Sequence, residues 1–271
     1  MISFKRNVNY VVPKVKLLRF FSIAFVLLVF SCEKEDLIRL NSLDDHVGIF
    51  EPRNKGCRVK RITSSDSYGT SYLDYIYDER GAIQRINTSK NNFIGFDYNT
   101  EGRIDSIYFN SLKGHYFIIH WNGTFPVRRE MFLADTLYSA SEFQFDEQGL
   151  LKAVSLLSYN NNQVYRRGFE YFFDTRKNML GWKIEGNFYL GYAFLRYDEM
   201  RNFRRLLGFE FFYQDIYSNA IQSFSSNNVL YADDIDRQRK YIYQYNKRGY
   251  PVLAKEFGAE STLIIVYENC D

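Results

Sequence analysis

One short pattern recurs along most of this chain and limits the folds it can adopt. It reads aromatic, any residue, aromatic, Asp or Asn, two polar residues and Gly, followed by alternating apolar residues. Asp or Asn opens a type I turn by accepting backbone hydrogen bonds, and Gly closes it at positive φ. Each copy therefore predicts a β-hairpin. The clearest copies carry the turn residues Asp78 and Gly81, Asn99 and Gly102, Asp146 and Gly149, and Asn246 and Gly249.

Weaker copies fill the gaps between these turns. The residues that open successive turns follow each other at steps of 21, 23, 24, 28, 24 and 48 residues, and the last is twice 24. A step of this length holds two strands and a second turn. The chain is therefore predicted to be all-β, an up-and-down antiparallel meander of about 15–16 strands. The weaker copies are Asp174 with Asn178, Asp198 with Asn202, and Asn122 with Gly123.

A meander of this size is not expected to stay flat, because large sheets curl, split or close to remove their edges. We expect a strongly curled sheet or one closed into a barrel-like body. A lipid-facing wall would need a continuous apolar face on every strand. In regular strands Arg103 and Asp105 would share a face with Ile107, and Arg166 and Glu170 would share one with Phe172. These mixed faces favour a body that faces water.

Residues 1–31 have the layout of a signal peptide. They carry five basic side chains and no acid, and they end in an apolar run from Phe20 to Phe30. A helix of that length reaches about 16 Å, too short for the ~30 Å hydrocarbon core. Ser31 directly before Cys32 resembles the lipobox of bacterial lipoproteins, in which the Cys is acylated and becomes the first residue. The alternative is an ordinary signal peptide with an incidental Cys.

Acidic residues follow Cys32 at positions 33, 35 and 36. This cluster resembles the surface-export signal of Bacteroidota lipoproteins, and it favours the surface of the outer membrane over the periplasmic face. Residues 32–55 are interpreted as a tether and residues 56–271 as one β-meander domain. The formal charge of +3 falls to −2 without the five bases of the signal peptide, which disfavours a nucleic-acid partner.

Two further cysteines lie at the two ends of the predicted domain, Cys57 and Cys270. Paired cysteines are common in oxidising compartments. Sequence alone does not bring their Cα atoms within bonding range. A disulfide and two buried free thiols both remain open.

A family resemblance follows from the turns and from three late segments. Residues 57–271 resemble a family of Bacteroidota envelope lipoproteins of unknown function with a porin-like, many-stranded antiparallel fold. The matching late segments are residues 226–229, 241–246 and 249–251. The turns are also similar to the Tyr-Asp repeats of secreted shell-forming proteins. The resemblance implies a fold and an envelope location, and it implies no activity.

Residues with catalytic or metal-binding chemistry are scattered. His115 and His120 lie an odd number of residues apart on one predicted strand, so they point to opposite faces and cannot share a metal. His46 lies in the tether. The chain has no Gly-x-Ser-x-Gly motif and no phosphate-binding Gly loop. We therefore expect neither a metal nor a cofactor.

Two functions remain under consideration. The favoured one is a lipid-anchored envelope protein that acts as a non-catalytic binding or structural module, with glycan or polypeptide as the ligand. The alternative is a carbohydrate-active hydrolase, which needs two carboxyl groups about 5–10 Å apart. Glu170 with Asp174 and Glu210 with Asp215 are the candidate pairs. The many Tyr and Phe side chains could pack the sheet or stack on sugars, and packing is favoured.

One turn is missing between Asp198 and Asn246, and residues 213–235 stand in its place. A connection of about 20 residues is uncommon in a compact domain. Apolar residues such as Ile216 and Phe224 predict that this segment folds back onto the sheet. It would then be either a cap that plugs one opening or a ligand lid.

Overall fold

The computed structural model describes residues 57–111, 113–160, 163–185, 190–213, 224–234 and 238–270. The chain divides into two compact units, Met1–Leu40 and Asn41–Asp271, and everything below concerns the second. The predicted signal peptide, Cys32 and the tether lie outside the described residues. Within the described ranges no helix is long and apolar enough to cross a membrane.

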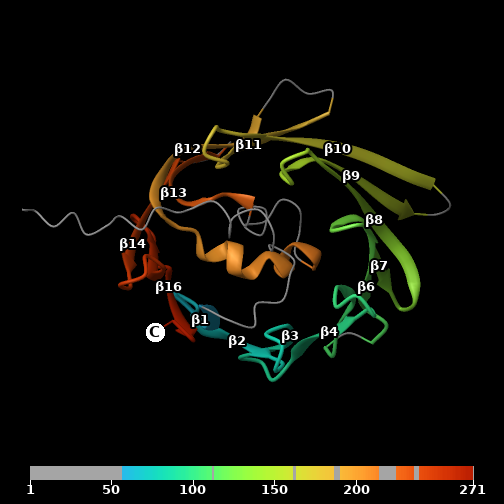
Figure 1. Cartoon of the computed structure of the whole chain (residues 1–271), viewed down its shortest axis with the longest axis horizontal. Helices are drawn as coiled ribbons and strands as arrows, with labels where there is room; N and C mark the ends of the chain where they lie inside the picture. Colours follow the sequence, from blue (N-terminus) through green and yellow to red (C-terminus); the bar gives the residue numbers. More distant parts are fainter. Residues whose placement is uncertain are drawn as a thin grey trace, which may run out of the picture. The chain divides into compact units, whose positions relative to one another are not determined.

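Sixteen antiparallel strands form one sheet around a short helix (Figure 1). Each strand pairs with the next in sequence, and β1 also pairs with β16, so the strand order closes on itself. The predicted all-β, up-and-down antiparallel meander of about 15–16 strands is confirmed. The strands are β1 (Arg58–Asp66), β2 (Gly69–Tyr77), β3 (Ile83–Thr88), β4 (Phe93–Tyr98), β5 (Ile104–Phe109), β6 (Tyr116–Asn122), β7 (Phe125–Leu133), β8 (Thr136–Phe145), β9 (Leu151–Asn160), β10 (Gln163–Phe173), β11 (Met179–Ile184), β12 (Leu190–Arg201), β13 (Asn227–Asp234), β14 (Gln238–Tyr245), β15 (Pro251–Glu256) and β16 (Thr262–Glu268).

The repeated turns lie at one end of the sheet, which we call the turn rim; the opposite end is the far rim. At Asp78 the N–H of Gly81 donates to the Asp78 carbonyl at 3.0 Å. The Asp78 Oδ1 atom accepts from the N–H groups of Arg80 and Ala82, both at 2.9 Å. Gly81 has a φ of 82°, which an L side chain rarely adopts. The same hydrogen bonds recur at Asn99, Asp146, Asp174 and Asn246.

The turn at Asp174 differs from the prediction in one position. The residue at positive φ is Lys177, at 65°, and not Asn178. The N–H of Lys177 donates to the Asp174 carbonyl at 3.0 Å, as a Gly does in the other turns. The spacing from Asp to the left-handed residue is therefore constant, and only the residue type varies.

A bulge follows each turn and changes which side chains face inward. Tyr98 pairs with Ile104 while Asp97 pairs with Ser106, so Asp105 is an extra residue. The expectation that Asp105 shares a face with Ile107 is therefore wrong: Ile107 is buried and Asp105 is exposed. The other turn-rim connections show the same shift, with the extra residues Lys60, Gln84, Val127, Lys152, Leu180, Leu230 and Val252.

The connection from β12 to β13 is a turn of this type with a long insertion. The Asp198 Oδ1 atom accepts from the N–H of Met200 at 3.0 Å, as the repeat requires. Its second donor is the N–H of Asn228, also at 3.0 Å, in the place that Asn202 would otherwise take. The prediction that Asp198 and Asn202 form a simple hairpin turn is therefore wrong. Residues 202–227 are an insertion, which begins earlier than the predicted segment 213–235.

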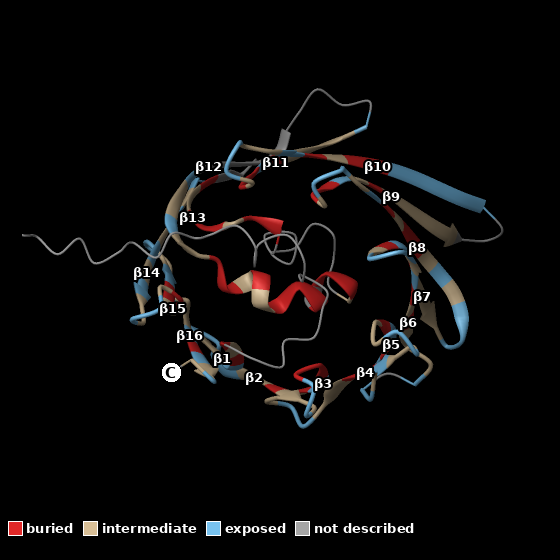
Figure 2. Ribbon diagram, viewed as in Figure 1, coloured by how far each residue is buried: buried red, intermediate tan, exposed pale blue. Residues whose placement is uncertain are grey.

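The insertion starts with a 3-10 helix, η1 (Phe203–Phe212), which lies inside the ring (Figures 1 and 2). Sequence analysis found no helix here. Phe203, Leu207 and Phe211 are all buried, and they belong to one core cluster with the inward residues of the strands. Among the described side chains of η1, all are buried except those of Arg204 and Leu206, which are half-buried. The helix therefore lacks the exposed polar face by which an amphipathic helix is recognised. Phe224 at the end of the insertion is also fully buried.

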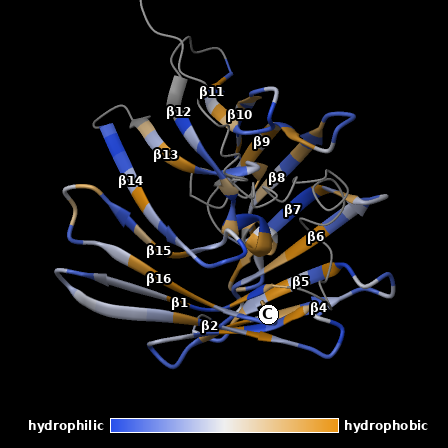
Figure 3. Cartoon of the chain, turned by 60° about the vertical axis from the view of Figure 1, so that its left-hand side comes forward, coloured by the Kyte–Doolittle hydropathy of each residue, from blue (hydrophilic) through white to orange (hydrophobic). Residues whose placement is uncertain are grey.

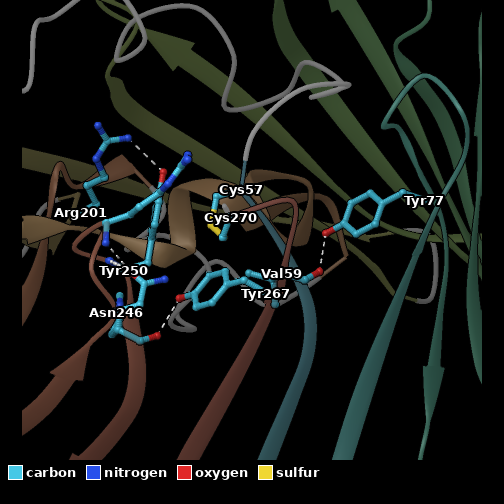
Figure 4. The surroundings of a disulfide bond; sticks show 10 residues. Cys57, Val59, Tyr77, Arg201, Asn246, Tyr250, Tyr267 and Cys270 are labelled. Atoms are coloured by element: carbon cyan, nitrogen blue, oxygen red, sulfur yellow. Dashed lines mark hydrogen bonds between the residues drawn. A yellow bond between two sulfur atoms is a disulfide. The ribbon is translucent and has the colours of Figure 1, made fainter.

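The connection from β16 to β1 is made by a disulfide. Tyr267 pairs with Val59 as Tyr77 pairs with Ile83 across a regular turn. Cys57 and Cys270 are bonded, with Cα atoms 4.4 Å apart (Figure 4). By the same count, Cys270 and Cys57 occupy the third and fourth positions of such a turn. The disulfide between them therefore replaces the peptide bond that joins these two positions in a regular turn. The ring is thus closed covalently at this point.

Candidate functional site

An internal pocket of about 500 Å³ lies between the inner face of β1–β5 and the start of η1. This volume is within the usual range for small-molecule sites, about 300–1,000 Å³. The middle of the pocket is apolar. Its apolar lining includes Ile62, Leu73, Ile94, Phe109, Leu263 and Phe203, with the ring of Tyr75.

Hydroxyl groups line the end of the pocket nearest the far rim. Ser64 and Ser71 face each other across β1 and β2, two pairs before the hairpin that joins these strands. Thr88 and Ser111 line the same end from β3 and from the end of β5. Lys90, in the connection after β3, is exposed. The pocket is therefore polar at its mouth and apolar below.

Arg204 of η1 is the deeper of the two cations in the lining. Its guanidinium carbon lies 5.1 Å from the centre of the Phe203 ring. Its backbone N–H donates to Asn202 Oδ1 at 3.0 Å. Among the described residues its guanidinium has no ion-pair partner, and the described lining of the pocket contains no Asp or Glu.

The far end of η1 is held by a buried arginine of the sheet. Arg129 on β7 donates from Nη1 to the carbonyls of Phe211 at 3.3 Å and Phe212 at 3.4 Å. Its Nη2 donates to Ser141 Oγ at 3.0 Å. A cation at the carboxyl end of a helix also matches the partial negative charge of the free carbonyls. Arg129 therefore fixes the position of η1 across the interior.

Asp198 holds the other end of the insertion. Its carboxylate accepts from the Asn228 N–H at 3.0 Å, from the Asn228 Nδ2 at 3.1 Å and from the hydroxyl of Tyr245. Burial raises the pKa of Asp198 above the ordinary range, although these hydrogen bonds act in the opposite direction. The two anchors, Asp198 and Arg129, keep η1 beside the pocket.

The predicted acid pair of Glu170 and Asp174 does not converge on a common site. Asp174 Oδ1 accepts from the N–H groups of Arg176 and Asn178, both at 2.8 Å. Glu170 forms an ion pair with Lys183 at 2.7 Å, on the half-exposed face of β10. Each carboxylate already has a structural partner. The side chains of Glu210 and Asp215 lie outside the described residues.

The two strand histidines have separate environments. His120 is exposed, and its Nε2 lies 3.0 Å from Glu130 Oε2. His115 stacks on the pocket residue Phe109, with ring centres 4.6 Å apart, and neither ring nitrogen has a hydrogen-bond partner. Burial lowers the pKa of His115. In the part of the chain that the structure describes, no three His, Cys, Asp or Glu side chains gather as metal ligands.

The fold is similar to that of a porin-like protein from Bacteroides uniformis. The two share 10% sequence identity at a TM-score of 0.56, over 78% of this chain and 98% of the other. A Tc holotoxin pore from Photorhabdus luminescens matches at a TM-score of 0.31 and 11% identity, and a TcdB2–TccC3 complex at 0.30 and 12%. The chain spans about a tenth of each toxin chain. It matches no protein-family model and no curated protein sequence.

Proposed function

We propose that this chain is a lipid-anchored protein of the cell envelope whose β body is a non-catalytic binding module. The observation that carries this proposal is the internal pocket beside η1, with its apolar middle, hydroxyl-lined mouth and two cations. A largely pre-formed apolar cavity with a few polar groups is the usual form of a ligand site. The ligand class is developed in the next subsection.

The polar side chains on the outer face of the ring favour a β body that is surrounded by water. Arg128 Nε lies 2.9 Å from Glu130 Oε1 and its Nη1 lies 3.1 Å from Glu142 Oε1. Hydrophobic and hydrophilic stretches are interleaved along the strands (Figure 3). A lipid-facing wall would instead carry a continuous apolar band. In this proposal the acyl chains on Cys32 attach the protein to the membrane. The attachment can be on either face of the outer membrane.

The position of the pocket is compatible with such an anchor. Cys57, where the described body begins, lies at the turn rim, whereas the hydroxyl-lined mouth lies toward the far rim. A body tethered through its N-terminal end could thus present the pocket away from the membrane. The fold of the Bacteroides neighbour, a porin-like protein, agrees with an envelope setting.

Binding is tested with the chain from residue 32 onward, carrying Cys32→Ala, on an array of envelope glycans, peptides and lipid-derived anions. Ser64→Trp places a large ring in the pocket. The matched control is Ser65→Trp, whose position points to the opposite face, toward Thr70. We expect Ser64→Trp to abolish the binding that the parent shows, and Ser65→Trp to retain it. The proposal is contradicted if the affinity is the same in the parent and in both variants, or if the parent binds nothing on the array.

Anchoring is tested separately in the full chain. Cys32→Ala should stop processing before residue 32 and move the protein out of the detergent phase, because a non-acylated chain lacks the anchor. Ser31→Ala keeps a small residue before the Cys and should behave as the parent. Normal processing and partitioning of Cys32→Ala would contradict the anchor.

A further inference from the structure

We infer that the internal pocket takes an amphipathic anion: an apolar chain that ends in one carboxylate, with the carboxylate at Arg204. This inference rests on the proposed binding function and names its ligand class. It departs from the glycan or polypeptide ligand expected from the sequence, because the interior of the pocket is mostly apolar.

The apolar part of the ligand is specified by the middle of the pocket. Ile62 and Leu73 approach it from β1 and β2, and Ile94 and Phe109 from β4 and β5. None of these four side chains offers a hydrogen bond. A sugar ring or a peptide backbone placed here would leave its polar groups without partners, which costs about 1–3 kcal/mol for each group. A hydrocarbon chain carries no such penalty.

The charge of the ligand is specified by Arg204. Arg204 lines a pocket whose described lining has two cations and no acid. Arginine remains protonated at all relevant pH values and binds a carboxylate through two parallel hydrogen bonds. Arg205, the next residue, is buried and does not line the pocket. Of the two arginines at the start of η1, Arg204 is therefore the one that lines the pocket.

The insertion is what places this arginine. Asn202 Oδ1 accepts the Arg204 N–H, and the Asn202 Nδ2 donates to the Ser225 carbonyl at 2.9 Å. The first turn of η1 is thus tied to the returning end of the same insertion. A ring without residues 202–227 would lose both the arginine and the floor that Phe203 forms.

The test uses calorimetric titration of the chain from residue 32 onward with Cys32→Ala, so that no acyl chain of the protein competes. The probes are octanoate, decanoate and decyltrimethylammonium, which has the decyl chain with the opposite charge. We expect decanoate to bind about fourfold more tightly than octanoate for each added CH₂. The decyl cation should bind at least ten times more weakly than decanoate.

Two substitutions assign the charge. Arg204→Met replaces the guanidinium by an uncharged side chain of similar length and should weaken decanoate binding about tenfold or more, since a charge-assisted hydrogen bond is lost. Lys90→Met removes the other lining cation, which is exposed at the mouth, and should change the affinity less than threefold. Ser64→Trp should abolish decanoate binding while the protein stays folded. This variant tests the pocket even if Arg204→Met does not fold.

The outcomes separate this inference from the proposed function. If decanoate binds the Arg204→Met and parent proteins equally, or if the decyl cation binds as well as decanoate, the ligand is not held by its charge and the inference is wrong. If a glycan or peptide binds in a Ser64-dependent way and decanoate does not, the binding module stands and the anion does not. If neither these three probes nor any member of the array binds, both are wrong.

Discussion

The backbone N–H of Asn228 donates to the carboxylate of Asp198 at 3.0 Å, although the two residues are 30 positions apart. In the regular turns the equivalent donor is four residues after the Asp or Asn, as Ala82 is after Asp78. The turn at Asp198 has therefore kept its geometry while its chain was opened to admit residues 202–227. This one relationship links the hairpin repeat to the helix inside the ring.

Removing the Asp198 carboxylate should destabilise the protein more than removing the same group at an ordinary turn. Asp198→Ala leaves the Asn228 N–H and the Tyr245 hydroxyl without an acceptor in a largely buried site. Each unpaired group costs about 1–3 kcal/mol. Asp146→Ala, at an exposed turn, should cost about 1 kcal/mol. Urea denaturation measures both, and an equal loss would mean that Asp198 does not hold the insertion.

The side chains of η1 should contribute as core residues. Phe211 is 1% exposed and packs against Phe143 and Phe224, with ring centres 4.8 and 5.2 Å away. Phe211→Ala should lower the free energy of unfolding by about 3–5 kcal/mol. Phe172→Ala, on a ring that is 36% exposed, serves as the control and should cost much less. Similar losses for the two variants would contradict a packed interior.

Stability should fall steeply above pH 10. Burial raises the pKa of Tyr98, Tyr243 and Tyr267 above the ordinary value near 10. Above that pH the unfolded chain releases phenolic protons that the folded chain retains, so the folded state loses stability as the pH rises. The free energy of unfolding is compared at pH 8 and pH 11.

Single tyrosine variants test the cause of the alkaline loss. Tyr98 donates its hydroxyl to the Ile83 carbonyl at 2.6 Å. Tyr98→Phe should be less stable at pH 8 and should lose less between pH 8 and pH 11 than the parent. Tyr68 is 98% exposed, and Tyr68→Phe should lose as much as the parent. If the parent, Tyr98→Phe and Tyr68→Phe lose the same free energy of unfolding between pH 8 and pH 11, groups other than Tyr98 cause the loss.

Breaking the disulfide should lower stability without changing the strand order. Cys57 and Cys270 are 213 residues apart, and in the chain-entropy model a loop of this size contributes about 5 kcal/mol. The double variant Cys57→Ser and Cys270→Ser should lose stability toward that amount and keep the β-sheet circular dichroism of the parent. Two alkylatable thiols in the non-reduced, denatured parent would contradict the bond itself.

The hairpins could be read from the sequence because their chemistry is local. Asp78 and Gly81 hold a turn together within a few residues, so the pattern is visible without the rest of the fold. The bulges could not be read this way, since the outward turn of Asp105 depends on how β5 pairs with β4. For the same reason the faces assigned by simple alternation were wrong next to the turns.

One regular feature had a visible signal that the sequence interpretation did not use. The aromatic residue before a turn donates to the carbonyl of the residue that follows the preceding turn, as Tyr98 does to Ile83 and Trp121 to Ile104 at 2.8 Å. Tyr77 and Tyr267 make the same bond, to Val59 at 2.8 Å and Pro251 at 2.7 Å. A Tyr or Trp at this position, where Phe would pack equally well, indicates a need for a donor.

The pocket and η1 lay beyond local patterns. Arg204 and Ser64 are far apart in sequence and meet only because the ring closes around the insertion. The described side chains of η1 are nearly all buried, so the helix shows no exposed polar face and its apolar residues resemble those of a strand. The pocket and the position of η1 both depend on contacts between residues that are far apart in the sequence.

The most direct test removes residues 202–227, so that Arg201 is followed by Asn228. This restores the spacing of Asp174 and Asn178 at the slot of Asp198. The account predicts a protein that retains its β-sheet circular dichroism, melts at least about 10 °C below the parent and no longer binds any ligand of the pocket. An excised protein that melts at the temperature of the parent would contradict the central claim that η1 and Phe224 of this insertion pack in the interior of the ring and that Phe203 forms the floor of its pocket.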